Sequence, residues 1–132
     1  MLAVDDQPQF RRAIRRLIER STALVVVAEA ASGEAAVKAV RELEPDLVLM
    51  DVRMPGVGGI AATRAIKRIR PKTVVLLVSS TPPDELPRHA DECLADAIVW
   101  KGDLCPRLLD EVWAKHDGRN SGPPRGARPK RQ

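Results

Sequence analysis

Short apolar runs alternate with longer segments of helical period along this chain, and this alternation restricts the fold more than any other feature. Runs rich in Val, Leu and Ile are typical of strands that are buried on both faces, as in a parallel sheet. The segments between them are long enough to form crossover helices on both faces. We therefore expect an α/β fold with a doubly wound, five-stranded parallel sheet. The predicted strands are Leu2 to Val4, Ala23 to Ala28, Leu47 to Met50, Thr73 to Val78 and Ala97 to Trp100.

Apolar residues recur at helical spacing between the strands, and each set predicts a stripe that packs against the sheet. Pro45 and Pro71 follow the second and third helices, where a proline cannot continue the hydrogen-bond pattern. The segment from Asp84 to Leu94 contains Pro87, so a fourth helix there should be short or displaced. The stripes are Phe10, Ile14, Leu17 and Ile18; Ala36, Val37, Val40 and Leu43; Ala62, Ala65, Ile66 and Ile69; and, in the last helix, Leu108, Leu109, Val112 and Trp113.

The net charge of +4 comes from the end of the chain. Residues 117–132 hold five Lys and Arg against one Asp, which leaves seventeen charged residues of each sign before them. This segment lacks Leu, Ile, Val and aromatic residues, so burial cannot offset its ordering entropy. We expect one domain over residues 1–116 and a disordered basic tail over residues 117–132. Such a tail would bind nucleic acid only weakly, through phosphates.

Cysteine content and hydropathy exclude several classes of protein. Cys93 and Cys105 are too few for a disulfide framework and lack the spacing of a zinc site. We expect both to be reduced packing residues. No apolar stretch is long enough to span a membrane, and no signal-peptide pattern follows Met1. The expected location is therefore the cytoplasm, with no membrane partner.

Polar side chains stand at the ends of the predicted strands. Asp5 and Asp6 follow the first strand, Asp51 follows the third, and Ser79 and Lys101 end the fourth and fifth. In a flavodoxin-like sheet of order 2-1-3-4-5, the first and third strands flank the point where the strand order reverses. Sites form there, beyond the carboxyl ends of the strands. We therefore expect these five side chains at one edge of the sheet.

Three crowded carboxylates would raise one another's pKa values unless a cation lies among them. A ligand set made only of oxygen suits Mg²⁺, which uses one or two carboxylates and leaves room for a substrate phosphate. Asp51 would then act as a nucleophile that forms an aspartyl phosphate. Lys101 would neutralise phosphoryl charge, and the Ser79 hydroxyl would donate a hydrogen bond to a phosphoryl oxygen. Ser80 and Thr81 are alternatives to Ser79.

Together these residues resemble the receiver domains of bacterial two-component response regulators. The resemblance covers residues 2 to about 116 and includes the acidic pair and the segment LVLMDVRMPGVGG around Asp51. Spacings of 45, 28 and 22 residues separate Asp6, Asp51, Ser79 and Lys101 in turn. The segment DVRMPGVGGIAAT looks most like receivers that usually precede a helix-turn-helix output domain.

The resemblance implies a role for each residue of the site. Asp51 would be the phosphoacceptor, and a histidine kinase would be the phosphodonor. Asp6 and Asp51 would bind Mg²⁺ directly, Asp5 would help through water, and the backbone carbonyl of Arg53 would be the third protein ligand. Such a chain is no enzyme in the usual sense, because it only assists its own Mg²⁺-dependent phosphorylation and dephosphorylation.

Three features depart from the family pattern. The first strand is short, because only four residues precede the acidic pair. Ile98 stands three residues before Lys101, where the family commonly has a Tyr or Phe whose inward swing accompanies phosphorylation. Gly102 follows the lysine in place of the usual Pro or Asp and predicts a looser loop. With the proline-containing segment from Asp84 to Leu94, these changes fall on the face through which receivers usually signal.

Three functions are consistent with the sequence. In the first, the chain is a stand-alone receiver that is phosphorylated on Asp51 by a histidine kinase and signals by protein contact or phosphorelay. In the second, it is an atypical receiver that acts as a protein-interaction module without phosphate, which the altered readout face favours. In the third, the basic tail binds nucleic acid under the control of the domain. The sequence also leaves a homodimer open.

Overall fold

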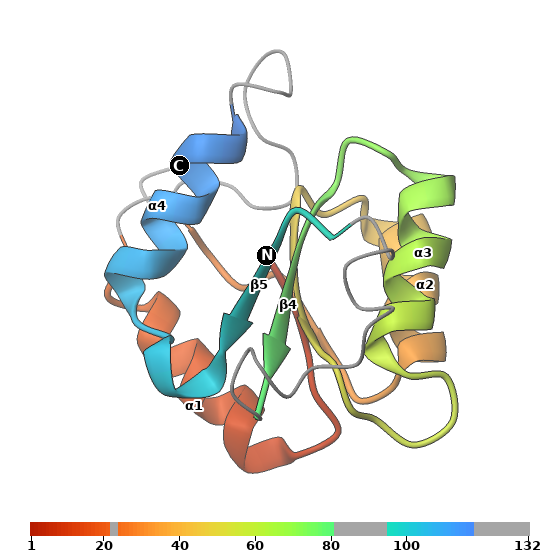
Figure 1. Ribbon diagram of the computed structural model, residues 1–132, viewed down its shortest axis with the longest axis horizontal. Helices are drawn as coiled ribbons and strands as arrows, with labels where there is room; N and C mark the ends of the chain where they lie inside the picture. The colour runs from red at the N-terminus through yellow and green to blue at the C-terminus, as the bar shows by residue number, and fades with distance from the viewer. Residues whose placement is uncertain (22–23, 81–94, 118–132) are drawn as a thin grey trace.

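The computed structural model describes residues 1–21, 24–80 and 95–117. Its elements in chain order are β1 (Leu2–Val4), α1 (Pro8–Ile18), β2 (Ala28–Ala30), α2 (Gly33–Leu43), β3 (Leu47–Asp51), α3 (Gly59–Ile69), β4 (Val74–Ser79), β5 (Ala97–Trp100), the 3₁₀ helix η3 (Lys101–Asp103) and α4 (Pro106–Asp117). In this part of the chain the strands form one five-stranded parallel sheet of order β2-β1-β3-β4-β5. Figure 1 shows α2 and α3 on one side of the sheet and α1 and α4 on the other. The predicted doubly wound α/β fold is confirmed.

Four of the five predicted strands lie within one residue of their predicted bounds. β1 and β5 have the predicted bounds, β3 extends one residue further, to Asp51, and β4 begins and ends one residue later, at Val74 and Ser79. Both β3 and β4 are buried along their whole length, which explains why each is a continuous apolar run instead of an alternating one. The short first strand is real, and it lies in the interior of the sheet between β2 and β3.

The predicted position of the second strand is wrong. The strand spans Ala28–Ala30 and shares only Ala28 with the predicted range, whose first residue lies outside the described part of the chain. Its pairing with β1 starts where Leu2 meets Ala28. Upstream of that pair, the backbone of Met1 bonds instead to Val25 and Val27, outside the strand ladder. Most of the apolar run therefore precedes the point where strand pairing begins.

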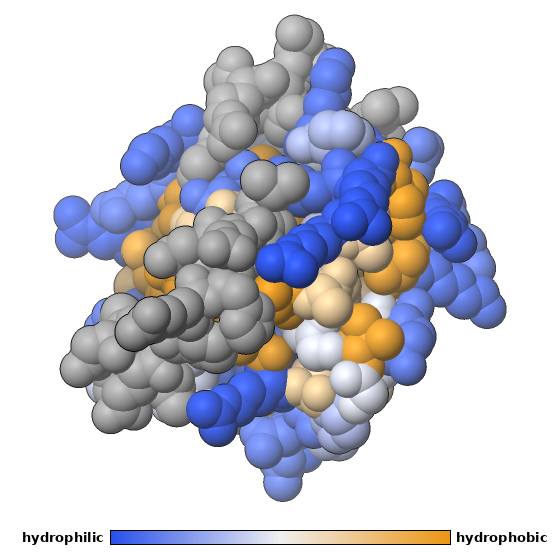
Figure 2. Space-filling model, turned by 45° about the vertical axis from the view of Figure 1, so that its right-hand side comes forward, coloured by the Kyte–Doolittle hydropathy of each residue, from blue (hydrophilic) through white to orange (hydrophobic). Residues whose placement is uncertain are grey.

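Helices pack on both faces of the sheet and bury two apolar clusters within the described residues. One cluster lies under α2 and α3 and the other under α1 and α4, as the predicted stripes require (Figure 1). Leu43 and Ile69 differ from the prediction, because they are 48% and 38% exposed. Each is the last residue of its helix. On the face drawn in Figure 2, hydrophilic side chains surround scattered apolar ones.

Local signals set the ends of the helices. The Ser32 hydroxyl caps α2 by accepting a hydrogen bond from the Ala35 amide at 3.1 Å. The same helix ends at Leu43, and the residue that caps it, Glu44, has a φ of 48° and precedes Pro45. Helix α3 stops two residues before Pro71. Both prolines thus follow helix ends, as the sequence predicts.

Some sequence predictions fall beyond the described residues. These are the segment from Asp84 to Leu94, Cys93 and residues 118–132 of the tail. Helix α4 includes Asp117, one residue past the predicted domain boundary. Cys105 is exposed just before α4, so the prediction that it packs inside is wrong. None of the described helices is both long and apolar enough to cross a membrane.

Candidate functional site

The predicted site residues gather at the carboxyl edge of the sheet. Asp5 and Asp6 follow β1, and Asp51 is the last residue of β3, the strand that pairs with β1. Ser79 ends β4, and Lys101 is the first residue after β5. Because all the strands are parallel, their carboxyl ends share one edge, and the β1–β3 pair is where the strand order reverses. The five residues therefore lie at one edge of the sheet, as expected, and their roles in a site stay a prediction.

Three carboxylates form a cluster at this edge. One oxygen each of Asp5, Asp6 and Asp51 lies within 4.8 Å of the other two. Asp5 is fully buried and Asp51 is 5% exposed, whereas Asp6 is exposed. An all-oxygen set of this size, with one member open to solvent, has the donor chemistry that a hard cation such as Mg²⁺ requires. Arg53, whose carbonyl is the predicted further ligand, follows Asp51 by two residues and has an exposed side chain.

Lys101 brings a positive charge into contact with the cluster. Its Nζ lies 3.0 Å from Oδ2 of Asp5 and 3.5 Å from Oδ1 of Asp51. The lysine side chain is only 18% exposed, so these contacts are poorly screened by water. Lys101 can therefore stabilise negative charge that gathers next to Asp51.

Burial and neighbouring charges make Asp51 a weaker acid than an ordinary aspartate. Its pKa rises from 3.8 to about 6, first because burial disfavours the charged form and next because Asp5 repels it. Lys101 opposes the rise by attraction and hydrogen bonding, and Asp6 adds a smaller increase. At neutral pH Asp51 is still mainly ionised, so it can act as a nucleophile.

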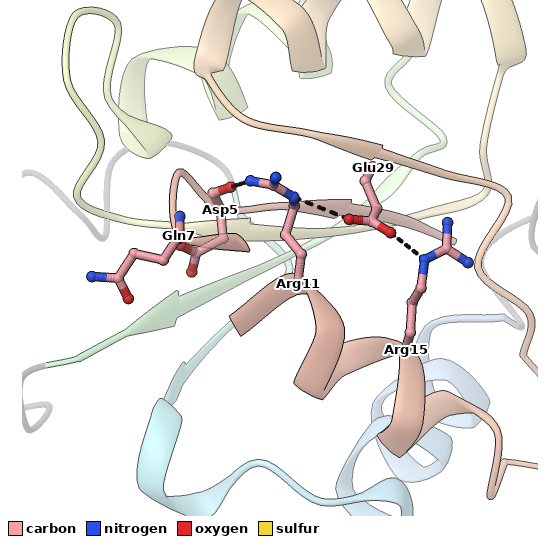
Figure 3. Close-up of polar contacts among 5 residues, drawn as sticks. All are labelled: Asp5, Gln7, Arg11, Arg15 and Glu29. Atoms are coloured by element: carbon pink, nitrogen blue, oxygen red, sulfur yellow. Dashed lines mark hydrogen bonds and ion pairs between the residues drawn. The ribbon is translucent and has the colours of Figure 1, made fainter. Parts of the chain in front are cut away.

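The loop that carries the acidic pair is held in place by α1 and β2 (Figure 3). The Gln7 amide donates to Oδ1 of Asp5 at 2.8 Å, and Arg11 donates to the backbone carbonyl of Asp5 at 2.5 Å. Arg11 also pairs with Glu29 of β2 at 3.0 Å, and Arg15 pairs with the other oxygen of Glu29. Arg11 could not be predicted as a neighbour of the acidic pair, because no sequence pattern distinguishes it from the other arginines of α1.

Gly59 allows helix α3 to start against the backbone of Asp51. A Cβ atom at this position would lie 1.9 Å from the carbonyl oxygen of Asp51, which no side chain could tolerate. The Gly59 amide also donates to the carbonyl of Val52 at 3.0 Å. The glycine thus fixes the loop after β3 close to the site.

Ser79 is the buried hydroxyl at the end of β4. It is 3% exposed and pairs in the sheet with Trp100. Ser80, the first alternative, is exposed, and Thr81 lies outside the described residues. Burial therefore favours Ser79 over Ser80 as the hydroxyl that belongs to the site.

The segment around Lys101 is more tightly packed than its glycine suggests. Residues Lys101–Asp103 form η3, and a Cβ on Gly102 would lie 2.8 Å from the Trp100 ring. Gly102 thus lies in a short 3₁₀ helix against the indole, and the looser loop stays a prediction. Ile98, which replaces the usual aromatic residue, packs against the apolar cluster under α2 and α3.

Phe10 is a further neighbour of the site that the sequence analysis assigned only to the apolar stripe of α1. Its ring centre lies 4.0 Å from the Nζ of Lys101. It also packs against the apolar cluster under α1 and α4, so the stripe assignment is correct but incomplete. The position of Phe10 one helical turn beyond the acidic pair is the one signal that could have suggested this contact.

Comparisons with known proteins agree with this geometry. A family model described as the response regulator receiver domain matches residues 1–112. Response regulator GacA of Pseudomonas viridiflava is 41% identical over 102 residues, which are 77% of this chain and 48% of that protein. Response regulator UvrY of Escherichia coli K12 is 34% identical over 119 residues, 90% of this chain and 55% of that protein.

A solved structure of a response regulator has the same fold. The two-component response regulator of the LuxR family from Aurantimonas sp. SI85-9A1 superimposes with a TM-score of 0.79 at 37% sequence identity. The superposition covers 89% of this chain and 84% of that one. The chain spans about half the length of the curated relatives that it matches.

Proposed function

This chain belongs to the response regulator receiver domains of two-component signalling, and on that premise we propose that Asp51 accepts a phosphoryl group from a histidine kinase. One observation carries the proposal. Lys101 lies 3.5 Å from the Asp51 carboxylate, at the edge of the sheet where Asp5, Asp6 and Asp51 converge. A buried carboxylate beside a lysine and two further carboxylates has the parts needed to form an aspartyl phosphate.

In the transfer step, a carboxylate oxygen of Asp51 attacks the phosphorus of a phosphohistidine. A P–O bond forms, the P–N bond breaks, and the departing imidazole nitrogen keeps the electron pair and takes up a proton. The burial of Asp51 limits the hydration that would weaken the nucleophile. Lys101 faces the charge on the phosphoryl oxygens, and the Ser79 hydroxyl donates to one of them.

Asp5, Asp6 and Asp51 would hold Mg²⁺ together with the backbone carbonyl of Arg53. The bound ion would supply positive charge to the phosphoryl oxygens. The same residues would assist the later loss of the phosphoryl group to water, which resets the switch. The phosphorylated chain then signals through contact with another protein or passes the phosphoryl group on.

Intact-protein mass spectrometry tests this proposal. The chain is incubated with acetyl phosphate and Mg²⁺, beside a sample in which EDTA removes the metal. We expect the wild type to gain one phosphoryl group only with Mg²⁺, and Asp51→Asn to gain none. Glu42→Gln, which removes a carboxylate with 60% exposure on α2, should behave like the wild type. A wild type that gains no phosphoryl group, or an Asp51→Asn variant that gains as much, would contradict the proposal.

Ile98 favours a second candidate, a receiver that acts through protein contacts without phosphate. A branched aliphatic side chain packed on the apolar cluster under α2 and α3 cannot make the inward swing of an aromatic ring. Hydrogen exchange of the phosphorylated and unphosphorylated chains separates the two candidates. Slower or faster exchange in β5 and α4 after phosphorylation supports the switch, and identical exchange there supports the phosphate-independent module.

A further inference from the structure

The ammonium of Lys101 lies between acidic groups and an aromatic ring. Its Nζ is 3.0 Å from Asp5, 3.5 Å from Asp51 and 4.0 Å from the centre of the Phe10 ring. A cation within about 6 Å of a ring centre is attracted by the negative face of the ring, and the attraction strengthens when water is excluded. With 18% exposure of its side chain, Lys101 meets both conditions.

Helix α1 fixes the ring relative to the acidic loop. Phe10 is partly buried against the apolar cluster under α1 and α4. The next residue, Arg11, donates to the backbone carbonyl of Asp5 and pairs with Glu29. These contacts hold the start of α1, and with it the backbone of Phe10, beside the loop that carries Asp5.

The carboxylates that hold Lys101 have other tasks in the proposed function. Oδ1 of Asp5 already accepts the Gln7 amide, and Oδ2 faces the lysine. A cation in the cluster would share the charge of Asp5, and phosphorylation would convert the Asp51 carboxylate into an acyl phosphate. The face of Phe10 has no oxygen ligand to offer Mg²⁺, so neither the metal nor the phosphoryl group would compete with the ammonium for the ring.

We propose that Phe10 is a positioning residue that holds the ammonium of Lys101 at the carboxylate cluster through the face of its ring. The contact itself is independent of the proposed phosphorylation, whereas its effect on the phosphorylation rate depends on that function. Phe10 adds an anchor for the lysine that neither binds the metal nor accepts the phosphoryl group.

The composition of the chain permits an unusually selective test. Phe10 is the only phenylalanine, so protein made with fluorinated phenylalanines is altered at this position alone. Fluorine weakens the negative face of the ring with little change in shape. As fluorines are added, the rate of Asp51 phosphorylation by acetyl phosphate should fall stepwise, by about two- to fivefold in total. In a Lys101→Met background, fluorination should leave the low residual rate unchanged.

A second measurement needs neither metal nor phosphodonor. The ¹⁹F NMR signal of monofluorinated Phe10 should move when Lys101→Met removes the charge above the ring. Lys38→Met, at a residue with 78% exposure on α2, should leave the signal in place. A signal that ignores Lys101→Met overturns the contact, whether or not Asp51 can be phosphorylated.

The two measurements also separate the failure of this inference from the failure of the proposed function. If the fluorine signal responds to Lys101→Met and no variant is phosphorylated, the contact stands and the proposed function fails. If Asp51 is phosphorylated at a rate that fluorination does not change, or changes equally without Lys101, Phe10 has no positioning role. Because the fluorinated rings keep the shape of phenylalanine, misfolding cannot imitate these results, as it could for Phe10→Leu.

Discussion

Asp51→Asn should make the metal-free protein more stable at neutral pH. Because burial and neighbouring carboxylates raise the pKa of Asp51 from 3.8 to about 6, its ionised form destabilises the folded state. At about 1.4 kcal/mol per pH unit, the full difference is at most about 3 kcal/mol. This difference already includes the opposing attraction of Lys101 for the carboxylate, and screening by water at the edge of the sheet reduces it further. We therefore expect a net gain of about 1 to 2 kcal/mol in the free energy of unfolding.

The stability gain of Asp51→Asn should depend on pH, and the raised pKa sets the direction of this dependence. The raised pKa means that folded Asp51 binds its proton more tightly than unfolded Asp51, so the wild type loses stability as the pH rises through 6. The advantage of Asp51→Asn should therefore be full at pH 7.5 and fade as the pH falls towards 4. Urea denaturation followed by circular dichroism, with EDTA present, measures the free energy of unfolding of both proteins at pH 7.5 and at pH 4.

Glu42→Gln serves as the control for this experiment, because it removes the charge of an exposed carboxylate. It should change stability by less than about 0.5 kcal/mol at either pH. The reasoning is refuted if Asp51→Asn is less stable than the wild type at pH 7.5. It is equally refuted if the gain has the same size at pH 7.5 and pH 4.

Further predictions concern the metal, the backbone and the acidic loop. In thermal melts, Mg²⁺ at ten times its dissociation constant should raise the free energy of unfolding of the wild type by about 1.4 kcal/mol. The same concentration should raise that of Asp51→Asn by less. Equal increases would exclude Asp51 as a ligand. Gly59→Ala should lower the free energy of unfolding in urea by at least about 2 kcal/mol, because its Cβ would overlap the Asp51 carbonyl. Gly58→Ala, whose Cβ would have its nearest contact at 3.6 Å, should lower it clearly less. Glu29→Gln should lower the free energy of unfolding by at most about 1 kcal/mol at pH 7, because Arg15 and Arg11 lower the pKa of Glu29. The loss should shrink as acid protonates the wild-type carboxylate below its ordinary pKa of 4.5. A loss that does not depend on pH would contradict the ion pairing.

The buried centre of the sheet could be predicted because its residues obey one simple rule. β3 and β4 are covered on both faces, so every position is apolar until the chain reaches Asp51 and Ser79. The second strand is not buried on both faces, so its residues are not all apolar. It lies at the edge of the sheet, where Glu29 can reach its arginine partners, and the apolar run before it lies largely outside the ladder. Hydropathy alone cannot show where pairing with β1 begins.

The candidate site likewise contains residues that could be predicted from the sequence and residues that could not. Its acidic residues and Lys101 could be predicted because parallel strands bring their carboxyl ends to one edge, whatever the details of packing. The roles of Phe10 and Arg11 depend on how α1 is rotated and how closely it approaches β5 and β2. These are properties of tertiary packing, and helical spacing shows only that Phe10 belongs to the apolar stripe. The closeness of the Trp100 ring to Gly102 is likewise a property of side-chain packing that the sequence does not show.

The packing of Trp100 on Gly102 gives the molecule an optical reporter of its own. The chain has two tryptophans, and Trp113 is 6% exposed in the apolar cluster under α1 and α4. Trp100 is 37% exposed, and it stands directly before Lys101 and pairs with Ser79. Lys101 is the first residue of η3, so a change in the backbone there would alter the surroundings of this indole. The fluorescence of Trp100 should therefore follow events at Asp51 in real time, and Trp113→Phe removes the second signal that comes from α4.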